Sequence, residues 1–294
     1  PVERSELLRK AAAADGLLAT LSDRIDDELL SLCPGLKVVS NYAVGYDNID
    51  VRAATDRGVV VTNTPDVLTA ATADIAFTLM LASARRLVEG NEFLRSGEWV
   101  TWQPNLLLGA DVSGAVLGIY GMGKIGQAVA RRARGFDMEI LYVNRSPREE
   151  AERELGARRV AFEELLARSD FISIHCPLSD ETRGLFNEST LRSMKKTAYL
   201  INTSRGPVVD QRALYRACSE GWIAGAGLDV FDIEPVPLDE PLLTLKNVTT
   251  IPHLGSATVR TRESMARLAV ENLLAALEGR RPSAVVNPEV LDGR

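Results

Sequence analysis

Three glycines at fixed spacing are the clearest chemical signal in the sequence. The segment "GIYGMGKIGQAVARRA" places Gly121, Gly123 and Gly126 in a G-x-G-x-x-G pattern, after a strand-like run and before a helix-like run. The first glycine permits a tight turn, the second lets the backbone approach a pyrophosphate, and the third lets the helix pack closely on the strand. Free N–H groups at the helix start would bind the anion. The segment therefore predicts a dinucleotide site, with Lys124 and Ile125 opening its helix.

The segment "YVNRSPR" bears on which dinucleotide binds. Asn144 lies 18 residues after Gly126, the last glycine of the pattern, where an acid usually accepts hydrogen bonds from the ribose of NAD. An acid would repel a 2′-phosphate, whereas Arg145 offers a planar fork that matches phosphate oxygens, and Ser146 and Arg148 are further donors. We expect a preference for NADP(H). If the arginines are only solvated loop charges, NAD(H) is the alternative cofactor.

Polar residues that could act in acid–base chemistry follow several other strand-like runs. Arg205 lies in "INTSRGPVVD", Asp229 and Glu234 lie in "LDVFDIEP", and His253 lies in "IPHLGSAT". Strand ends of an open α/β sheet converge on the ligand crevice, so these side chains are predicted to meet there. A histidine in such a place can serve as a general acid. By themselves the residues leave open a surface ion pair of Arg205 with Glu234 and a structural loop histidine.

Short apolar runs alternate with helix-like segments along the chain, which predicts an α/β fold with parallel sheets. The segment within 69–87 repeats apolar residues at helical spacing and is expected to form one long packing helix that ends near Arg85 and Arg86. The expected strands cover residues 16–20, 37–40, 59–61, 116–120, 139–143, 171–175, 198–202, 223–230 and 248–251.

Composition narrows the class of protein. The 294 residues are 46% hydrophobic and 25% charged, with a net charge of −6, which argues against a nucleic-acid surface. Three widely spaced cysteines without CxxC pairing suggest neither disulfides nor a metal site and fit a reducing cytoplasm. Apolar stretches stay below membrane-spanning length, and the N-terminus lacks the apolar core of a signal peptide, so we expect no membrane partner.

Several segments together resemble the D-isomer-specific 2-hydroxyacid dehydrogenases, over nearly the whole chain. They are "NYAVGYDNID", "GMGKIG", "HCPLSDET", "INTSRG", "GLDVFDIEP", "PHLGSAT" and "VVNPEV". Within that family, "YVNRSPR" and "PLLTLKN" are most similar to glyoxylate and hydroxypyruvate reductases. The resemblance implies two Rossmann-like domains with doubly wound parallel sheets. A cofactor domain over residues 71–256 would be inserted into a substrate domain made of residues 1–70 and 257–294.

The resemblance also implies a catalytic set. Arg205 would bind the substrate carboxylate and carbonyl oxygen, and His253 would protonate the nascent alkoxide while Glu234 holds its other ring nitrogen. The backbone N–H groups of Val44 and Gly45 would hold the substrate carboxylate. The implied reaction is hydride transfer between NADPH and a small 2-oxo acid, glyoxylate or hydroxypyruvate, giving a D-2-hydroxy acid.

Further cofactor contacts are implied at four positions. Asp229 would accept a hydrogen bond from the nicotinamide carboxamide, and Thr72, Pro177 and Thr203 would also contact the cofactor. His175, which directly precedes Cys176 and Pro177, is expected to be structural or to line this site. In this family the segment that holds Trp99 and Trp102 takes part in a dimer contact, so we expect a homodimer through the cofactor domain, although packing is the simpler role for both rings.

Alternatives remain open at this stage. Phosphoglycerate and phosphite dehydrogenases share the catalytic set, and related folds also serve as nucleotide-sensing corepressors or scaffolds. Formate dehydrogenases carry Gln where Glu234 stands. One departure concerns the N-terminus, because relatives begin with a strand that precedes the helix-like "PVERSELLRK". We therefore expect a truncated substrate domain with an exposed strand edge.

Overall fold

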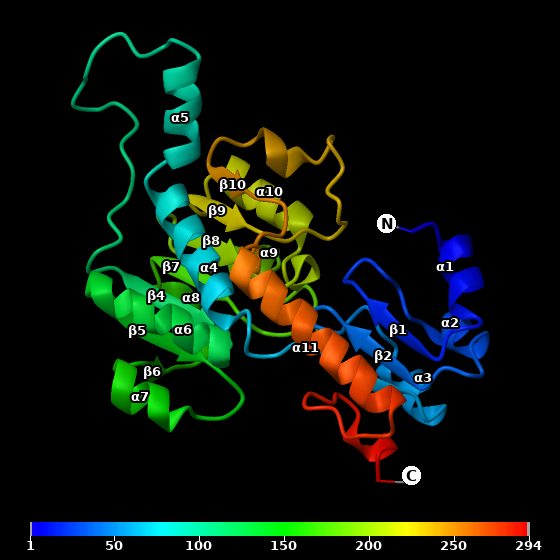
Figure 1. Ribbon diagram of the computed structural model, residues 1–294. Coiled ribbons are helices and arrows are strands. Elements are labelled where there is room, and N and C mark those ends of the chain that lie inside the picture. Colours follow the sequence, from blue (N-terminus) through cyan, green and yellow to red (C-terminus); the bar gives the residue numbers. More distant parts are fainter. Residues whose placement is uncertain (1, 293–294) are drawn as a thin grey trace. The chain divides into compact units, whose positions relative to one another are not determined.

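The computed structural model of the protein describes residues 2–292, and its elements are labelled in Figure 1. The chain divides into two compact units, Pro1–Leu68 with Ser256–Arg294, and Thr69–Gly255. Each unit is an α/β layer structure around its own sheet, and the paired strands of both sheets run parallel. The α/β class and the parallel sheets expected from the alternating pattern are therefore present.

The first unit is built on a three-stranded sheet of order β1-β2-β3. Its helices cover both faces, because Val38 of β2 packs toward α11 through Leu273 while the next residue, Val39, joins the core on the opposite face. Within the described residues β1 is an edge strand, and Leu18 on it is exposed. The elements are α1 (Arg4–Ala11), β1 (Gly16–Ala19), α2 (Asp27–Ser31), β2 (Val38–Asn41), α3 (Val51–Asp56), β3 (Val60–Thr62), α11 (Val259–Leu277) and η4 (Pro288–Val290).

The second unit is built on a seven-stranded sheet of order β10-β9-β8-β7-β4-β5-β6. The order reverses between β4 and β7, and such a reversal opens a crevice at the carboxyl ends of the two strands. The strands are β4 (Val116–Tyr120), β5 (Glu139–Val143), β6 (Arg158–Arg159), β7 (Phe171–Ile174), β8 (Tyr199–Asn202), β9 (Gly225–Leu228) and β10 (Val248–Thr250).

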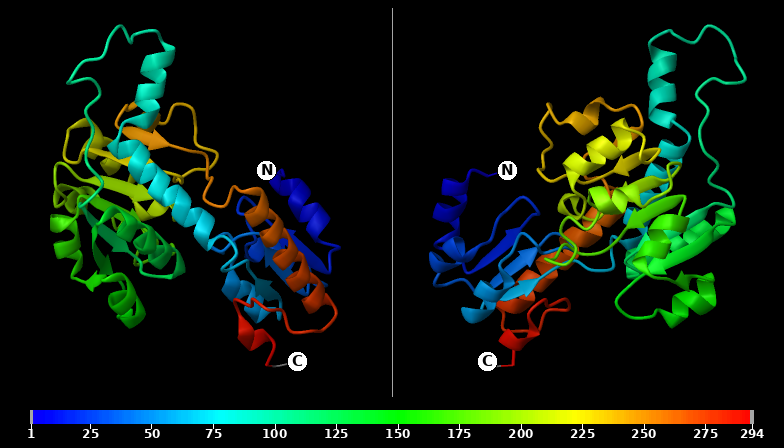
Figure 2. Two further views of the ribbon diagram at one scale, coloured as in Figure 1. Left: turned by 60° about the vertical axis from the view of Figure 1, so that its left-hand side comes forward. Right: turned by 180° about the vertical axis from the view of Figure 1, so that it is seen from behind.

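Helices cover both faces of this larger sheet (Figure 2). Along β7, Phe171 packs with α4 and α6, whereas Ile172 packs with α8, α9 and α10, as the two-residue period of a strand requires. The helices are α4 (Thr69–Ala84), α5 (Leu87–Arg95), α6 (Lys124–Ala133), α7 (Glu149–Leu155), α8 (Phe162–Arg168), α9 (Glu188–Arg192) and α10 (Gln211–Ser219). The 3₁₀ turns are η1 (Arg134–Phe136), η2 (Gly206–Val208) and η3 (Pro241–Thr244). Among the described residues, every helix is too short or too polar to cross a membrane.

The expected single helix over 69–87 is wrong. α4 ends at Ala84, Arg86 adopts a left-handed conformation with φ of 50°, and α5 starts at Leu87. The break has a tertiary cause, because the carbonyl oxygen of Ala84 accepts the N–H of Ala110 at 2.8 Å from the returning chain. Each of the nine expected strands is present, with ends shifted by at most a few residues, while the two-residue β6 was not expected.

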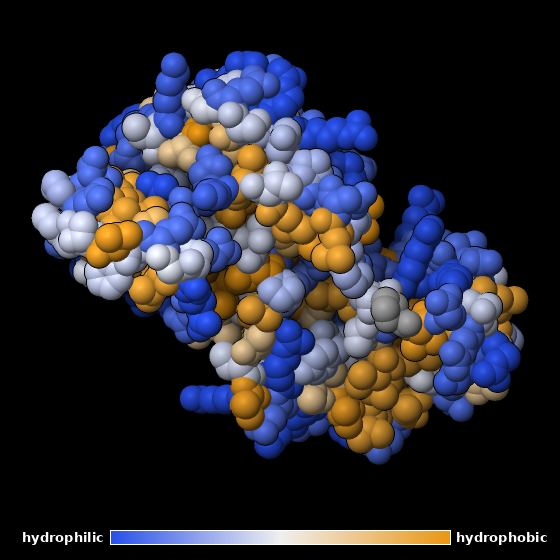
Figure 3. Space-filling model, turned by 90° about the horizontal axis from the view of Figure 1, so that it is seen from above, coloured by the Kyte–Doolittle hydropathy of each residue, from blue (hydrophilic) through white to orange (hydrophobic). Residues whose placement is uncertain are grey.

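The segment around α5 carries apolar side chains on its surface. No residue of α5 is buried, and Trp102 and Val100 in the loop after it are 75% and 90% exposed. Apolar patches interrupt the mostly hydrophilic surface in the view of Figure 3. The exposed apolar side chains of this segment follow one another along the chain and mark a candidate interaction surface.

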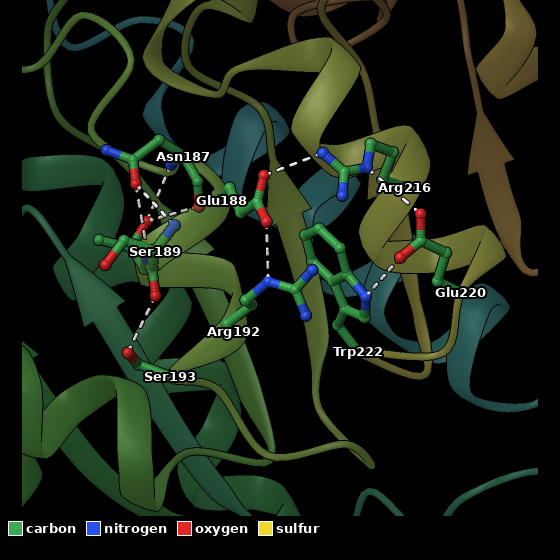
Figure 4. A network of polar contacts seen from close by, with 9 residues as sticks. Asn187, Glu188, Ser189, Arg192, Ser193, Arg216, Glu220 and Trp222 are labelled. Atoms are coloured by element: carbon green, nitrogen blue, oxygen red, sulfur yellow. Dashed lines mark hydrogen bonds and ion pairs between the residues drawn. The ribbon is translucent and has the colours of Figure 1, made fainter.

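A polar network ties α9 to α10 (Figure 4). Glu188 accepts hydrogen bonds from Arg192 and Arg216 at 2.9 Å each, and both guanidinium groups lie over the ring of Trp222, at 3.5 and 5.0 Å from its centroid. The indole Nε1 donates to Glu220 at 3.0 Å. The network covers a nearly buried ring and anchors α10, the helix that follows the predicted substrate-binding Arg205.

We expect Trp222→Ala to lower the stability of the second unit by about 3 kcal/mol, because it removes the buried ring and both cation–π contacts. Thermal unfolding followed by circular dichroism measures the effect. Leu238→Ala, at a 97% exposed position of the same unit, is the control and should leave the melting temperature nearly unchanged. Equal melting temperatures for the two variants would contradict the stabilising role of the ring.

Candidate active site

The glycine-rich turn has the local geometry that a dinucleotide pyrophosphate requires. Gly121 has φ of 100°, and a Cβ there would lie 2.7 Å from the carbonyl carbon of His175, so a side chain at this position would clash with the backbone that follows β7. A Cβ on Gly126 would lie 2.3 Å from the carbonyl oxygen of Gly121. By contrast, the space around Gly123, the N-cap of α6, is open. The turn is therefore tight where the chain packs on itself and open where a pyrophosphate would bind.

The loop after β5 is held in one shape by its own hydrogen bonds. Asn144 Nδ2 donates to the carbonyl oxygen of Ser146 at 2.9 Å, and Arg159 donates to the carbonyl oxygens of Asn144 and Arg145. The guanidinium of Arg145 is exposed and donates to Glu181 Oε2 at 2.8 Å. The loop thus presents the Arg145 cation, paired with the Glu181 carboxylate, next to the end of β4, the strand that precedes the glycine-rich turn.

Glu234 and His253 meet although they lie 19 residues apart in the chain. His253 Nδ1 and Glu234 Oε2 are 2.6 Å apart, and the other oxygen of Glu234 accepts the N–H of Phe231 at 2.9 Å. The two side chains, of His253 and Glu234, are 29% and 35% exposed, so the pair remains accessible. The contact fixes the ring at Nδ1 and leaves Nε2 available for proton transfer.

A buried residue, Asp229, holds the backbone at His253 and directly after it. Asp229 is 1% exposed, and its two oxygens accept the N–H groups of Leu254 and Gly255. The carbonyl oxygen of Asp229 also accepts the N–H of His253 at 3.0 Å. These bonds stabilise His253 in a left-handed conformation, with φ of 52°, that is unfavourable for a residue other than glycine.

The turn that carries Arg205 is shaped by Asn202 and Gly206. Asn202 Oδ1 accepts the backbone N–H of Ser204, and its Nδ2 donates to the carbonyl oxygen of Arg205 at 2.9 Å. A Cβ on Gly206 would lie 2.0 Å from the carbonyl carbon of Phe231. Only a glycine therefore lets the Arg205 turn approach the segment that leads to Glu234.

The charges around Glu234 set its protonation state. Burial raises the pKa of this carboxyl, but the hydrogen bond and positive charge of His253, the Phe231 N–H and the charge of Arg205 outweigh it, so the net pKa is lowered. Glu234 is therefore ionised at neutral pH and can stabilise an imidazolium. For Asp229, burial is the largest effect and raises the pKa to about 6, although Leu254, His253 and Gly255 oppose it.

The second histidine is not equivalent to the first. Burial lowers the pKa of His175 to about 4, and its Nε2 lies 2.8 Å from Ser173 Oγ. A neutral imidazole of this kind cannot donate a proton readily at neutral pH. His253 is therefore the better candidate for a general acid.

Comparison with known proteins decides the family. Residues 77–255 match the model of the D-isomer specific 2-hydroxyacid dehydrogenase, NAD binding domain. The chain belongs to the D-isomer specific 2-hydroxyacid dehydrogenase family. It is similar to the glyoxylate reductase of Thermococcus kodakarensis, with 55% identity over 297 residues that cover 100% of this chain and 89% of that protein. The glyoxylate reductase of Korarchaeum cryptofilum is 53% identical over the same shares of both chains.

Solved structures of related proteins have the same fold as this chain. A protein of Thermus thermophilus aligns with a TM-score of 0.91 and 49% identity, over 97% of this chain and 90% of that one. The NADPH-dependent glyoxylate/hydroxypyruvate reductase of Sinorhizobium meliloti, crystallised with NADP and malonate, aligns with a TM-score of 0.86 and 36% identity, over 94% of this chain and 85% of that one. The protein is therefore an NAD(P)-dependent dehydrogenase with Rossmann-type domains, as the sequence motifs predicted.

The remaining predicted cofactor contacts of this dehydrogenase lie in the second unit. Thr72 near the start of α4 is close to Gly255, since a Cβ on that glycine would lie 3.5 Å from Thr72 Cγ2. Thr203 Oγ1 is buried and, among the described residues, has no hydrogen-bond partner, which suits a group that contacts a cofactor. Pro177 is exposed just after β7. The glycine turn, the helix start and this hydroxyl together fit a nicotinamide dinucleotide.

The predicted substrate contacts Val44 and Gly45 lie in the first unit, in the loop after β2. Asn63 Nδ2 donates to the carbonyl oxygen of Val44 and Asn41 Nδ2 donates to that of Gly45, at 2.8 Å each. Within residues 2–292 the N–H groups of these two residues make no hydrogen bond. The loop is thus fixed through its carbonyls while its N–H groups stay available.

Two positioning residues were not predicted from the sequence. Gln211 at the start of α10 accepts the N–H of Asp232 at 2.9 Å and donates to Glu240 at 2.6 Å, so it holds the loop that carries Glu234 at two points. No local signal identifies it, because its partners lie more than 20 residues away. Asn202 was also missed, although an asparagine two residues before a serine at a strand end is a recognisable turn signal.

Among the described residues, no group of three His, Cys, Asp or Glu side chains could hold a metal ion.

We expect Gly206→Ala to lower kcat about a hundredfold, because the added methyl group forces the Arg205 turn away from the Phe231 segment and misplaces the guanidinium. Steady-state kinetics measures kcat, and circular dichroism checks the fold. Gly135→Ala, at an open position of the same unit, should retain activity. A fully active Gly206→Ala enzyme would show that the close approach does not position Arg205.

Proposed function

We propose that this dehydrogenase reduces small 2-oxo acids, glyoxylate or hydroxypyruvate, to D-2-hydroxy acids, with NADPH preferred over NADH. The observation that carries the proposal is the 2.6 Å contact between His253 Nδ1 and Glu234 Oε2, with the charge of Arg205 acting on the same carboxylate. Relatives named glyoxylate reductase, 51–55% identical to this chain, favour the small substrate.

The proposed roles follow from the chemistry of each group. When bound, the reduced nicotinamide supplies a hydride to the substrate carbonyl carbon. Arg205 binds the substrate and stabilises negative charge on the carbonyl oxygen, and His253 donates the proton from Nε2. Glu234 stabilises the positive imidazolium before transfer and fixes its orientation.

The proposal also assigns parts to the two units. Residues 1–70 with 257–294 would form the substrate domain, in which the N–H groups of Val44 and Gly45 hold the substrate carboxylate. Residues 71–256 would form the cofactor domain. The exposed apolar segment of α5 and the loop with Trp99 and Trp102 supports a homodimer through this domain, a state that sedimentation equilibrium measures directly.

A substrate panel tests the reaction. We expect NADPH oxidation with glyoxylate and hydroxypyruvate, measured by loss of absorbance at the nicotinamide band, to exceed oxidation with any larger 2-oxo acid. NAD(P)+ reduction with 3-phosphoglycerate or phosphite is measured in parallel. A faster reaction with either of these would assign the protein to a different branch of the family, and no turnover at all would favour a nucleotide-sensing role.

His253→Ala tests the proton donor. Loss of general-acid catalysis should lower kcat about 10²- to 10⁴-fold, while the Kd for NADPH stays within about threefold. Fluorescence titration gives the Kd. Glu234→Gln keeps a hydrogen bond to Nδ1 but removes the charge, so its kcat should fall less than that of His253→Ala. Parallel losses in kcat and cofactor binding would indicate a structural role for the histidine.

Arg145→Ala tests the cofactor preference. A charge-assisted contact to the 2′-phosphate contributes about 1.5–3 kcal/mol, so its loss should lower kcat/KM for NADPH roughly ten- to a hundredfold and leave that for NADH unchanged. Asn144 and Ser146 in the same loop are proposed to assist. Arg153→Ala, at an exposed arginine paired with Glu154, is the matched control. An unchanged ratio of the two kcat/KM values would refute the preference.

A further inference from the structure

We propose that Glu181 is a specificity-determining residue of the cofactor site, whose carboxylate competes with the 2′-phosphate for Arg145 and so limits the preference for NADP. The inference rests on the proposed function, in which Arg145 binds that phosphate. Glu181 lies 36 residues after Arg145, on the loop between β7 and α9, and its Oε2 accepts from Arg145 Nη2 at 2.8 Å.

The pair lies at the carboxyl edge of the sheet, where the cofactor would bind. Arg145 follows the end of β5, and Glu181 follows β7, the strands on either side of β4. Tyr120, the last residue of β4, is close enough for both charges to act on its hydroxyl. The charge of Arg145 lowers the pKa of Tyr120 and that of Glu181 raises it. Burial and Cys176 have larger effects, and both raise the pKa. The carboxylate therefore lies near the end of β4, the strand that precedes the glycine-rich turn.

Both loops are held in place, so the pairing does not depend on two mobile segments. Arg159 and Asn144 fix the backbone of the Arg145 loop, as described above. On the other side, Thr182 is 6% exposed, its Oγ1 donates to the carbonyl oxygen of Pro177 at 2.7 Å, and it accepts the N–H of Ser179 at 2.8 Å. The residue next to Glu181 is thus anchored, and the carboxylate is presented from a fixed turn.

The charges decide the effect of this arrangement. The Arg145 and Glu181 side chains are 79% and 75% exposed, and exposed ion pairs are weak, so a phosphate can displace the carboxylate from the guanidinium. The displaced carboxylate stays attached to its anchored turn, where it repels a phosphate that carries nearly two negative charges. NADH lacks the 2′-phosphate and is not repelled in this way. Glu181 therefore lowers the affinity for NADPH selectively.

Removal of the carboxylate should strengthen binding of the 2′-phosphate. We expect Glu181→Gln to bind 2′,5′-ADP about three- to tenfold more tightly than the wild type in low salt, as measured by calorimetry on the full chain, and to bind ADP within about twofold of it. The gain should shrink in about 0.5 M salt, because surface charges are screened. The ratio of kcat/KM for NADPH and NADH should rise by a similar factor.

The controls separate this inference from the proposed function. Glu154→Gln removes an exposed carboxylate paired with Arg153 in the same unit and should leave both affinities unchanged. If Arg145→Ala weakens 2′,5′-ADP while Glu181→Gln changes nothing, the role of Glu181 is overturned and the NADP site stands. If Arg145→Ala has no effect, the proposed NADP site itself fails. Weaker binding by Glu181→Gln, or an equal gain by Glu154→Gln, would also overturn the role of Glu181.

Discussion

The hydrogen bond between Glu234 and His253 is the interaction on which the proposed chemistry depends, and it exists because β9 and β10 are neighbours in parallel register. Leu228 at the end of β9 pairs with Thr250 at the end of β10, so the loops that follow start at the same level of the sheet. The loop after β9 brings Glu234 to the shared edge, and the loop after β10 brings His253. A shift of one residue in this register would move the start of one loop by about 3.3 Å along the strand and separate the pair.

Two carboxylates near this edge have different tasks because their surroundings differ. Asp229 is almost completely buried and holds two backbone N–H groups, while Glu234 is partly exposed and meets a side chain that can become positive. Burial raises the pKa of Asp229 to about 6, whereas the opposite charges keep the pKa of Glu234 low. One acid therefore maintains the shape of the loop, and the other tunes the imidazole.

Close backbone contacts at two glycines bring the loops of the second unit together. Gly121 touches the chain at His175, at the reversal of the sheet order, and Gly206 touches it at Phe231, between the Arg205 turn and the Glu234 loop. In each place a side chain would displace backbone atoms, which cannot move away as a flexible side chain can. The cofactor turn and the catalytic loops therefore both require a glycine, because backbone atoms pass where a Cβ would lie.

Local patterns in the sequence were sufficient for every described strand except β6, for the glycine turn and for the candidates His253 and Glu234, because periodicity and glycine spacing act over a few residues. Tertiary structure alone decided where α4 ends, since Ala110 binds the carbonyl of Ala84, and what the carboxylate of Asp229 holds. It also placed Glu181 against Arg145. Such partners are separated by about 25 residues or more, and only the packing of distant segments of the chain against one another brings them into contact.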